Sequence, residues 1–535
     1  CTSLCCKTAY DEQIQMAFAC TVSFVYFFLL PTTMQNGTRL AAIDLGSNSF
    51  RLEIGKFEGG QIERVEYLKE TVRQGAGLDE DNVLSVDAME RGWSCLQRFR
   101  ERLAGFCKEN IRAVGTQTLR QAVNRDEFLE HGRQILGVPI DVVSGREEAR
   151  LIYQGAASLL PRSSERRLVV DIGGRSTELI IGKNLHAHTL ESFQTGSVTW
   201  SMRYFPKGEF TPSAVRKAVV AAKAELDEAL EAYGTDHWDV AYGCSGTVAA
   251  VSDLLCAAGG PPGVVTREGL DWLVQRMLQA RNAAALNLVG LRDDRRSVIG
   301  GGVSVLRALF DLLEIKEMHV SVGALRQGVL HDLLRRQQPA TDIRSQTVTK
   351  LMEKFSADSG QATRVERTAL ALYRQLPHLD SQLQERRERK LRWAARLHEI
   401  GTHISHSNYH RHGAYILDNA EAPGFALSEL HHLSQLVLGH RGKLHKLDID
   451  WVEGTFASAL LALRLAVIFC HARRNPRIAG ISLQPAKKAG PAGKGGFVLT
   501  VPADWAASFP QSHYLLEQEV LAWSRTRIAF KLVVQ

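Results

Sequence analysis

Residues 42–49 read AIDLGSNS and residues 170–177 read VDIGGRST, and this repeated pattern decides the fold of the chain. Each copy is an apolar run that ends in Asp, an aliphatic residue and Gly, followed by a small polar turn. Apolar residues resume after each turn, at Phe50 and at Leu179, so each copy predicts two strands joined as a tight hairpin.

Turns of this composition suit phosphate binding. Small residues let backbone N–H groups approach phosphate oxygens, and a flanking carboxylate, Asp44 in the first copy and Asp171 in the second, can hold Mg²⁺ through oxygen ligands. A single turn of this kind usually does no more than reverse the chain. Two copies predict two similar lobes that enclose one phosphate chain between them.

The sequence around both copies alternates between strand and helix patterns, which predicts an α/β layer architecture. Strands are expected over 39–67 and 140–143, a strand running into a helix over 111–120, and helices over 87–106 and 212–233. Gly300-Gly301-Gly302 is expected to precede a helix over 303–313. After a polar linker the pattern is helical to about residue 474, and short strands follow at 481–483 and 497–501.

A chain of 535 residues is expected to hold several domains, since about 150 residues is a usual domain size. The patterns predict an extension of doubtful status (1–33), a first lobe with one phosphate loop (34–151), a second lobe with the other (152–337), a helical domain (338–474) and a small α+β domain (475–535).

Positive charge gathers toward the C-terminus. Residues 336–535 carry 27 Lys and Arg against 17 Asp and Glu, whereas the rest of the chain carries 38 against 41. Such a surface would attract a polyanion, although a solvated basic face gives the same composition. The nine cysteines include no C-x-x-C pair, so neither a disulfide framework nor a zinc site is indicated, and a reducing compartment is favoured.

The N-terminal end of the chain is unusual. Residues 14–30 form an uncharged, aromatic-rich apolar run of about membrane-spanning length. The chain starts at Cys1, and Met34 stands shortly before the first strand pattern. The simplest interpretation is that residues 1–33 are an upstream extension or result from the choice of start site; a membrane anchor is the alternative.

Five motifs together resemble the exopolyphosphatase and guanosine pentaphosphate phosphatase family, of the superfamily of actin, sugar kinases and the Hsp70 ATPase. They read DLGSNSF (44–50), GTQTLRQA (115–122), SGREEAR (144–150), DIGGRSTE (171–178) and SGT (245–247). The resemblance extends to the C-terminus, where LRWAA (391–395) and residues 406–425 are more similar to the exopolyphosphatase branch. It implies two actin-like lobes, a helical HD-like domain and a small α+β C-terminal domain.

Hydrolysis of a phosphoanhydride needs a base to orient water, a metal to offset charge, and donors for the phosphate oxygens. By resemblance, Glu148 matches the catalytic base, with Glu147 as the weaker candidate, and Asp171 and Glu178 match the magnesium positions. The remaining candidates would bind substrate: Asn48, Ser49, Gly173, Gly174, Ser176 and Thr177 as donors, and Arg120 and Arg326 as charges.

Each of these residues also has an ordinary structural interpretation. A carboxylate in the first turn of a helix offsets the helix dipole, a carboxylate beside a turn bonds to that turn, and an isolated Arg pairs with a surface acid.

Two features depart from known patterns. Arg175 stands where the second loop of the family usually has Gly or Ala, so its side chain would reach a phosphate or narrow the cleft. His398-Glu399 stands where HD phosphohydrolases carry His-Asp, and several histidines around it could bind a divalent metal. These histidines are His403, His406, His410, His412 and His440. Because Glu is one methylene longer than Asp, and the resemblance implies a degenerate copy of this domain, a binding role is favoured over a second active site.

The leading prediction is a cytoplasmic, magnesium-dependent exopolyphosphatase that releases terminal phosphate from inorganic polyphosphate through a water activated by Glu148. The alternative is removal of the γ-phosphate of guanosine pentaphosphate (pppGpp) in the stringent response. An actin-like ATPase and a non-catalytic polyanion binder are further alternatives. The resemblance implies a homodimer, no nucleic-acid partner is expected, and the N-terminal apolar run leaves peripheral association with the inner face of the cell membrane open.

Overall fold

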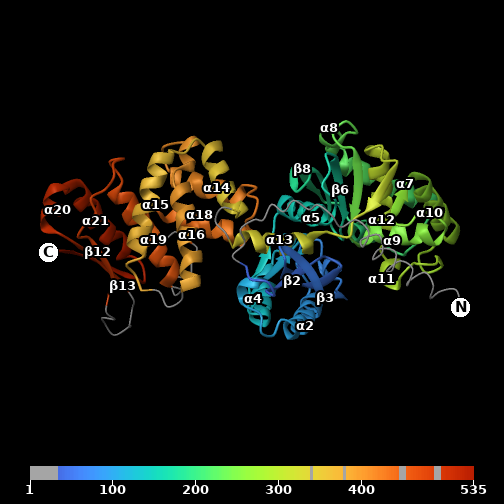
Figure 1. Ribbon diagram of the computed structural model, residues 1–535, viewed down its shortest axis with the longest axis horizontal. Helices are drawn as coiled ribbons and strands as arrows, with labels where there is room; N and C mark the ends of the chain where they lie inside the picture. The colour runs from blue at the N-terminus through green and yellow to red at the C-terminus, as the bar shows by residue number, and fades with distance from the viewer. Residues whose placement is uncertain (1–33, 338–340, 378–380, 445–446, 448–453, 487–495) are drawn as a thin grey trace.

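The computed structural model describes residues 34–337, 341–377, 381–444, 447, 454–486 and 496–535. Figure 1 shows an elongated molecule, with two α/β lobes at one end and a mostly helical half, which ends in the C-terminus, at the other. Within the described ranges no helix is long and apolar enough to cross a membrane. The extension predicted at 1–33 lies outside those ranges.

The first lobe is built on a five-stranded sheet in the order β3-β2-β1-β4-β5. β1 and β2 form the first predicted hairpin, with Leu45 opposite Phe50, and the three residues between them, 46–48, are loop 1. β4 and β5 continue the sheet in parallel on the other side of β1. The strands are β1 (Arg39–Leu45), β2 (Ser49–Glu58), β3 (Gln61–Thr71), β4 (Ile111–Gly115) and β5 (Ile140–Val142).

The second lobe repeats this topology in the order β10-β11-β9-β6-β7-β8, in which β6 and β7 take the places of β1 and β2. These two strands form the second predicted hairpin, with Ile172 opposite Thr177, and residues 173–176 between them are loop 2. The strands are β6 (Arg166–Ile172), β7 (Thr177–Lys183), β8 (His186–Phe193), β9 (Val240–Cys244), β10 (Val264–Thr266) and β11 (Glu317–Val320).

Helices cover both sheets. Those of the first lobe are η1 (Gln74–Gly77), α2 (Val86–Arg102), η2 (Lys108–Asn110), α3 (Gln117–Gln121) and α4 (Arg125–Leu136). Those of the second lobe are α6 (Ser197–Tyr204), α7 (Pro212–Leu226), α8 (Ala229–Tyr233), α9 (Ser245–Ala257), α10 (Arg267–Ala280), α11 (Asp293–Arg296) and α12 (Ile299–Leu312).

The glycine triplet at 300–302 was predicted to precede a helix. In the structure it lies inside the first turn of α12. A Cβ added at Gly301 would lie 2.5 Å from the carbonyl oxygen of Ser197. The turn therefore packs directly against the backbone of α6, and glycine is retained there for close approach rather than to end a loop.

Two helices exchange partners between the lobes. α5 (Gly145–Leu159) follows the first sheet but packs on β7 and β8 of the second, whereas α13 (Leu325–Arg336) follows the second sheet and packs on β1 and β4 of the first. A Cβ added at Gly155 or at Gly328 would lie within 2 Å of a carbonyl oxygen of the other helix, so their backbones are in contact. The boundary predicted at 151/152 falls inside α5, because this helix belongs to the second sheet.

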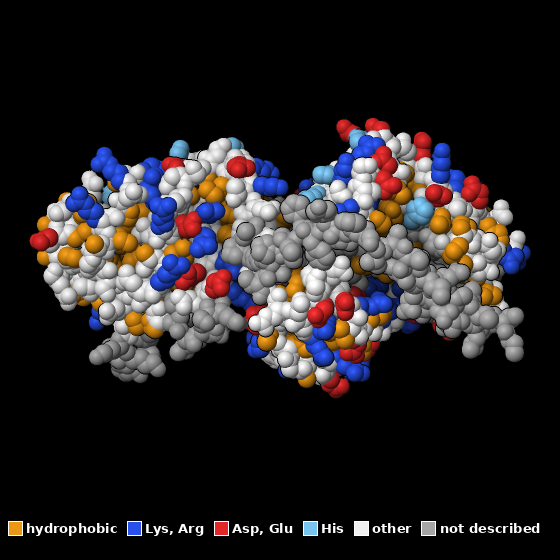
Figure 2. All heavy atoms as spheres, in the orientation of Figure 1, with side chains coloured by type: hydrophobic (Ala, Val, Ile, Leu, Met, Phe, Trp, Pro, Cys, Tyr) orange, Lys and Arg blue, Asp and Glu red, His pale blue; other side chains and the backbone are white. Residues whose placement is uncertain are grey.

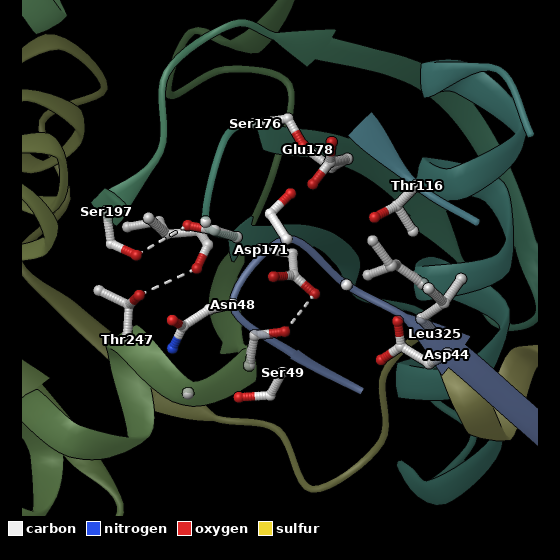
Figure 3. Close-up of a pocket in the computed structure, with 18 of the residues that line it drawn as sticks. Asp44, Asn48, Ser49, Thr116, Asp171, Ser176, Glu178, Ser197, Thr247 and Leu325 are labelled. Atoms are coloured by element: carbon white, nitrogen blue, oxygen red, sulfur yellow. Dashed lines mark hydrogen bonds between the residues drawn. The ribbon is translucent and has the colours of Figure 1, made fainter. Parts of the chain in front are cut away.

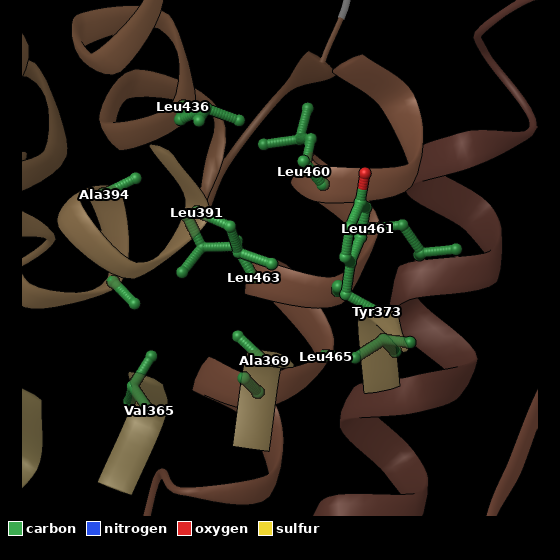
Figure 4. Close-up of a cluster of buried hydrophobic side chains, with 14 of the residues drawn as sticks. Val365, Ala369, Tyr373, Leu391, Ala394, Leu436, Leu460, Leu461, Leu463 and Leu465 are labelled. Carbon is green, nitrogen blue, oxygen red and sulfur yellow. The ribbon is translucent and has the colours of Figure 1, made fainter. Parts of the chain in front are cut away.

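The C-terminal half combines helices with a small sheet in the order β12-β13-β14. One cluster of buried apolar side chains runs through both, from Leu391 and Leu460 of the helices (Figure 4) to Leu483 and Leu499 of the sheet. The elements are α14 (Ile343–Lys354), α15 (Ser359–Tyr373), α16 (Ser381–Leu397), η3 (Ile400–His403), α17 (Tyr409–Asn419), α18 (Leu427–Gly439), α19 (Gly454–Phe469), β12 (Ser482–Ala486), β13 (Gly496–Val501), α20 (Ala503–Ser508), α21 (Pro510–Trp523) and β14 (Ala529–Val534).

The predicted fold class is confirmed: two lobes of repeated α/β topology precede a helical region and a small α+β region. The boundary predicted at 474/475 falls between the last helix of the helical region and the small α+β region, but the two regions share one core, because both contribute to the same apolar cluster.

Candidate active site

Loops 1 and 2 face each other across a cleft between the lobes. A Cβ added at Gly174 of loop 2 would lie 3.0 Å from the Cβ of Ser47 in loop 1, so the cleft is closed at this point. It holds about 590 Å³, open solvent at its mouth included. Figure 3 shows carboxylates and small polar side chains of the cleft, among them Asp44, Asn48 and Asp171. Two arginines line it as well, and the polar and glycine residues of the lining include Asp44, Asn48, Ser49, Arg51, Thr116, Glu148, Asp171, Gly173, Gly174, Ser176, Glu178, Ser197, Ser245, Thr247 and Arg295.

Loop 2 is shaped by hydrogen bonds that keep its carbonyl groups occupied. The N–H of Gly173 donates to the carbonyl of Ser176 at 2.9 Å, which closes the turn, and the N–H of Val198 donates to the carbonyl of Gly174 at 2.8 Å. The Ser197 hydroxyl donates to the Gly173 carbonyl at 3.0 Å. The carbonyls of both glycines point toward the start of α6, so their partial negative charge is directed away from an anion in the cleft.

Two buried carboxylates flank loop 2, one at the end of β6 and the other in β7. Asp171 Oδ2 accepts a hydrogen bond from the Ser245 hydroxyl at 2.7 Å, and Glu178 Oε1 accepts one from Ser192 at 2.8 Å. Burial, with Asp44 nearby, raises the pKa of Asp171 to about 6. Burial, with Glu148 and Asp171 nearby, raises the pKa of Glu178 well above its usual value. Carboxylates this close together repel one another when they are ionised, so the arrangement favours binding of a cation between them.

Glu148 enters the cleft from the first turn of α5. Ser144 caps this helix, and its hydroxyl oxygen accepts the Glu147 N–H at 3.2 Å. Arg120 donates to Glu148 Oε2 at 3.2 Å and to the Val143 carbonyl at 2.6 Å, which fixes the carboxylate beside loop 1. Burial raises the pKa of Glu148 to about 7, against the opposing effect of Arg120. A carboxyl group with this pKa suits proton transfer near neutral pH.

Glu147, the weaker candidate for the base, is committed elsewhere. Both of its carboxylate oxygens accept hydrogen bonds from Arg150, at 2.7 and 2.8 Å, and Oε2 also accepts the N–H of Gly424 from the C-terminal half at 2.8 Å. Its carboxylate does not line the cleft. The structure therefore separates the two adjacent glutamates, one facing the cleft and one joining the lobes to the C-terminal half.

Three predicted substrate residues do not line the cleft. The Thr177 hydroxyl is buried and donates to the carbonyl of Thr195 at 2.6 Å. Arg326 lies behind Asp44 and donates to Glu53 at 3.1 Å. Arg120 contacts the cleft only through Glu148. Asn48, Ser49, Gly173, Gly174 and Ser176 lie where they were predicted, together with Glu148, Asp171 and Glu178.

Two arginines that line the cleft were missed. Arg51 donates to Asp44 at 3.0 Å, directly across the β1–β2 hairpin, and Arg295 is buried beside Gly246. Arg51 could have been found as a charge that lies between Phe50 and Leu52 of the strand that follows loop 1. Arg295 belongs to a run of charges, DDRR at 293–296, which gives no signal in the sequence.

The described histidines of the C-terminal half do not form a metal site of three or more ligands. His398 and His440 are buried with ring centroids 5.4 Å apart, and their Nδ1 atoms lie 2.7 and 2.5 Å from carbonyl oxygens of their own helices. In the described part of the chain no group of three or more His, Cys, Asp or Glu is placed to hold a metal ion.

Much of the positive charge of the C-terminal half is paired. Arg344 and Arg389 contact the buried Asp342, and Arg464 pairs with Glu519 inside the core. Further pairs join Arg374 to Glu388, Arg392 and Arg396 to Glu366, and Arg473 to Asp358 and Glu399. On the face shown in Figure 2, Lys and Arg of this half are scattered among acidic side chains and form no continuous basic patch.

The two lobes and the C-terminal half each match a known family model. The model of the Ppx/GppA phosphatase family matches residues 54–337, and the model of domain III of the same family matches residues 343–520. The chain belongs to the Ppx/GppA phosphatase family. Proteins named guanosine-5'-triphosphate,3'-diphosphate pyrophosphatase from Photobacterium profundum and Vibrio cholerae are 37% and 39% identical to it, over 92% of this chain and 97% and 98% of their own.

Two solved structures share the fold over more than half of this chain. An exopolyphosphatase-like protein covers 57% of this chain and 99% of its own, with 27% identity and a TM-score of 0.52. An exopolyphosphatase from Cytophaga hutchinsonii, 22% identical, shares the fold over 56% of this chain and 98% of its own, with a TM-score of 0.50. The prediction of a Ppx/GppA phosphoanhydride hydrolase is confirmed at the level of the family. The names of the relatives that match 92% of the chain favour the pppGpp alternative over the leading exopolyphosphatase prediction.

Proposed function

We propose that this Ppx/GppA protein is a pppGpp phosphohydrolase, which removes the terminal phosphate from the 5'-triphosphate of guanosine-5'-triphosphate,3'-diphosphate. The proposal rests on one observation, the pair of facing phosphate loops with the Glu148 carboxylate in the same closed cleft. Relatives that span 92% of this chain bear the name of that activity.

Magnesium is the proposed cofactor, with Asp171 and Glu178 as its protein ligands. Mg²⁺ in phosphate-binding sites usually takes one or two protein carboxylates and completes its shell with phosphate and water oxygens. Two buried carboxylates of raised pKa, with Asp171 Oδ1 free of hydrogen bonds among the described residues, fit this requirement without a third protein ligand. When bound, the ion would offset the charge of the phosphate oxygens.

The residues of the cleft divide the reaction between them. Glu148, held by Arg120, accepts a proton from a water molecule as the water oxygen attacks the terminal phosphorus. Backbone N–H groups of the two loops donate to the non-bridging oxygens and hold the phosphate in line with the water. The bond from phosphorus to the bridging oxygen breaks, and the products are orthophosphate and guanosine 5'-diphosphate 3'-diphosphate.

Replacing Asp171 by Ala is expected to raise the Mg²⁺ concentration needed for half-maximal activity by at least about tenfold, and Glu178→Ala to act in the same direction, because each variant removes a carboxylate oxygen from the ion or from its water. Titration of phosphate release against Mg²⁺ measures this. Glu191→Ala, which removes an exposed carboxylate that pairs with Arg146, is the matched control. An unchanged Mg²⁺ dependence in both site variants would remove them from the metal site.

Inorganic polyphosphate is the second candidate substrate, because the basic C-terminal half would attract a long polyanion. The ion pairs described above reduce the charge available for such contacts. Arg386 of α16 is exposed and lies 3.8 Å from Glu109 of the first lobe, whereas Arg387 and Lys390 are partly exposed and have no ion pair within 4 Å among the described residues. These three residues provide the means of separating the two substrates.

We expect kcat/KM for phosphate release from pppGpp to exceed that from long-chain polyphosphate and from tripolyphosphate when all three are assayed side by side. Neutralising Arg386, Arg387 and Lys390 by Gln should leave pppGpp hydrolysis within about twofold of the original, since these side chains do not line the cleft. A preference for long polyphosphate that is lost in this triple variant, and that falls steeply with salt, would instead identify a polymer substrate.

A further inference from the structure

Arg175 of loop 2 reaches across the cleft to the first lobe. Its Nη1 donates to the carbonyl oxygen of Gly75 in η1 at 2.8 Å, and its Nε donates to the side-chain oxygen of Gln121 at the end of α3 at 3.1 Å. Both acceptors belong to the first lobe, whereas Arg175 belongs to the second. The side chain therefore ties the two lobes together at the point where their phosphate loops meet.

The segment that receives Arg175 also shapes loop 1. The N–H of Gly75 donates to the Ser47 carbonyl at 2.7 Å, and the N–H of Arg73 donates to the Asn48 carbonyl at 2.9 Å. Thr118, from the same short helix as Gln121, donates to the Ser47 hydroxyl at 2.8 Å. The path from loop 1 through Gly75 to Arg175 thus joins the two phosphate loops by consecutive hydrogen bonds.

The guanidinium has no acidic partner in the described part of the chain. Its hydrogen-bond acceptors are neutral, and burial lowers its pKa. Two glycines leave room for Arg175. A Cβ added at Gly75 would lie 3.0 Å from Cδ of Arg175, and a Cβ added at Gly196 would lie only 2.5 Å from the backbone nitrogen of Arg175. A half-buried cation without a counter-ion, beside two phosphate loops, is compensated best when the cleft holds an anion.

We propose that Arg175 is a positioning residue that latches the two phosphate loops in the closed arrangement, so that closure around the terminal phosphate depends on this side chain. The latch rests on the proposed function only in taking the substrate to be a phosphate chain. Gly or Ala, the residues expected here from the family pattern, would make neither hydrogen bond.

The experiment compares Arg175→Met, Arg175→Lys and Gln121→Met in the full-length protein. Two measurements are made on each: kcat and KM for pppGpp, and amide hydrogen exchange of the segment 72–77 without substrate. Arg203→Met, which removes an exposed arginine from α6, is the control for loss of charge. Thermal unfolding verifies that each variant is folded.

A latch predicts that Arg175→Met lowers kcat/KM on the order of 10-fold, with part of the loss in kcat, and speeds exchange of segment 72–77. Arg175→Lys should lie in between, because it keeps the charge and can reach one acceptor. Gln121→Met should show a smaller effect in the same direction, and the double variant should be no worse than Arg175→Met, since both side chains serve one contact.

Unchanged exchange of segment 72–77 in Arg175→Met would overturn the latch, as would additive effects of Arg175→Met and Gln121→Met. A rise in KM alone, with kcat and exchange unchanged, would mean that Arg175 only binds substrate, and would also overturn it. The exchange measurement needs no substrate, so its outcome is independent of whether pppGpp is hydrolysed.

Discussion

Replacement of Glu148 by Gln is expected to lower kcat by about 10²- to 10⁴-fold while leaving substrate affinity nearly unchanged. The amide keeps the shape of the side chain and its place beside Arg120, but it cannot accept a proton from the attacking water. Phosphate release under single-turnover conditions, together with binding of pppGpp by calorimetry, separates the loss of chemistry from any loss of affinity.

Glu147→Gln is the matched control, because Glu147 is adjacent in sequence, equally buried and bonded to Arg150 and Gly424 rather than facing the cleft. This variant should alter thermal stability more than kcat. If Glu147→Gln shows the fall in kcat that is expected for Glu148→Gln, and Glu148→Gln stays active, the assignment of the base is wrong.

Replacement of Asp332 by Asn should destabilise the protein by about 3–5 kcal/mol, because it removes the shared counter-ion of buried arginines. Asp332 is almost fully buried in α13 and accepts hydrogen bonds from Arg112 of β4 at 2.7 Å, Arg150 of α5 at 2.8 Å and Arg336 at 2.5 Å. The lower end of the range is expected if Glu147 and Glu429 still compensate Arg150 and Arg336. The midpoint of thermal unfolding measures the effect.

The pH dependence of this variant follows from the pKa of Asp332. Burial by itself would raise that pKa, but Arg336, Arg150 and Arg112 hold it well below its usual range. A lowered folded-state pKa contributes stability that is complete above the unfolded-state pKa, about 3.9, and is lost as the pH falls through the folded-state value. The difference between the original protein and Asp332→Asn should thus be constant near neutral pH and shrink below about pH 4. A difference that grows on acidification would contradict the ion-pair explanation.

The repeated Asp-aliphatic-Gly pattern predicted both hairpins and the similarity of the two lobes, because a strand, a tight turn and a second strand are specified by neighbouring residues. The exchange of α5 and α13 between the sheets was not predictable in this way. Nothing within residues 145–159 distinguishes a helix that covers its own sheet from one that covers the other. The boundary predicted at 151/152 therefore falls inside α5 for a physical reason, the absence of a local signal for long-range packing.

The candidate site was predictable where its residues stand in the loops themselves, as for Asn48 and Gly174. Thr177 and Arg326 were misplaced because a side chain one residue past a turn, or at the start of a helix, is directed by packing that the sequence does not reveal. Arg295 is brought to the cleft by a helix far along the chain. The basic composition of the C-terminal half also overstated the positive charge that is available to a polyanion, because composition does not show which charged side chains are paired.

The crossing of α5 and α13 determines the width of the cleft. At Gly155, Gly323 and Gly328 an added Cβ would come within about 2 Å of backbone atoms of the opposing segment, so no layer of side chains separates the two helices. Protein interiors are packed too densely to absorb such an intrusion by small adjustments. Even a methyl group at one of these positions would push the helices apart and carry the sheets, with their loops, along with them. The distance between the two phosphate loops is thus set where the two helices cross, next to Ile152 and Leu325 of the cleft lining, by three residues that have no side chain.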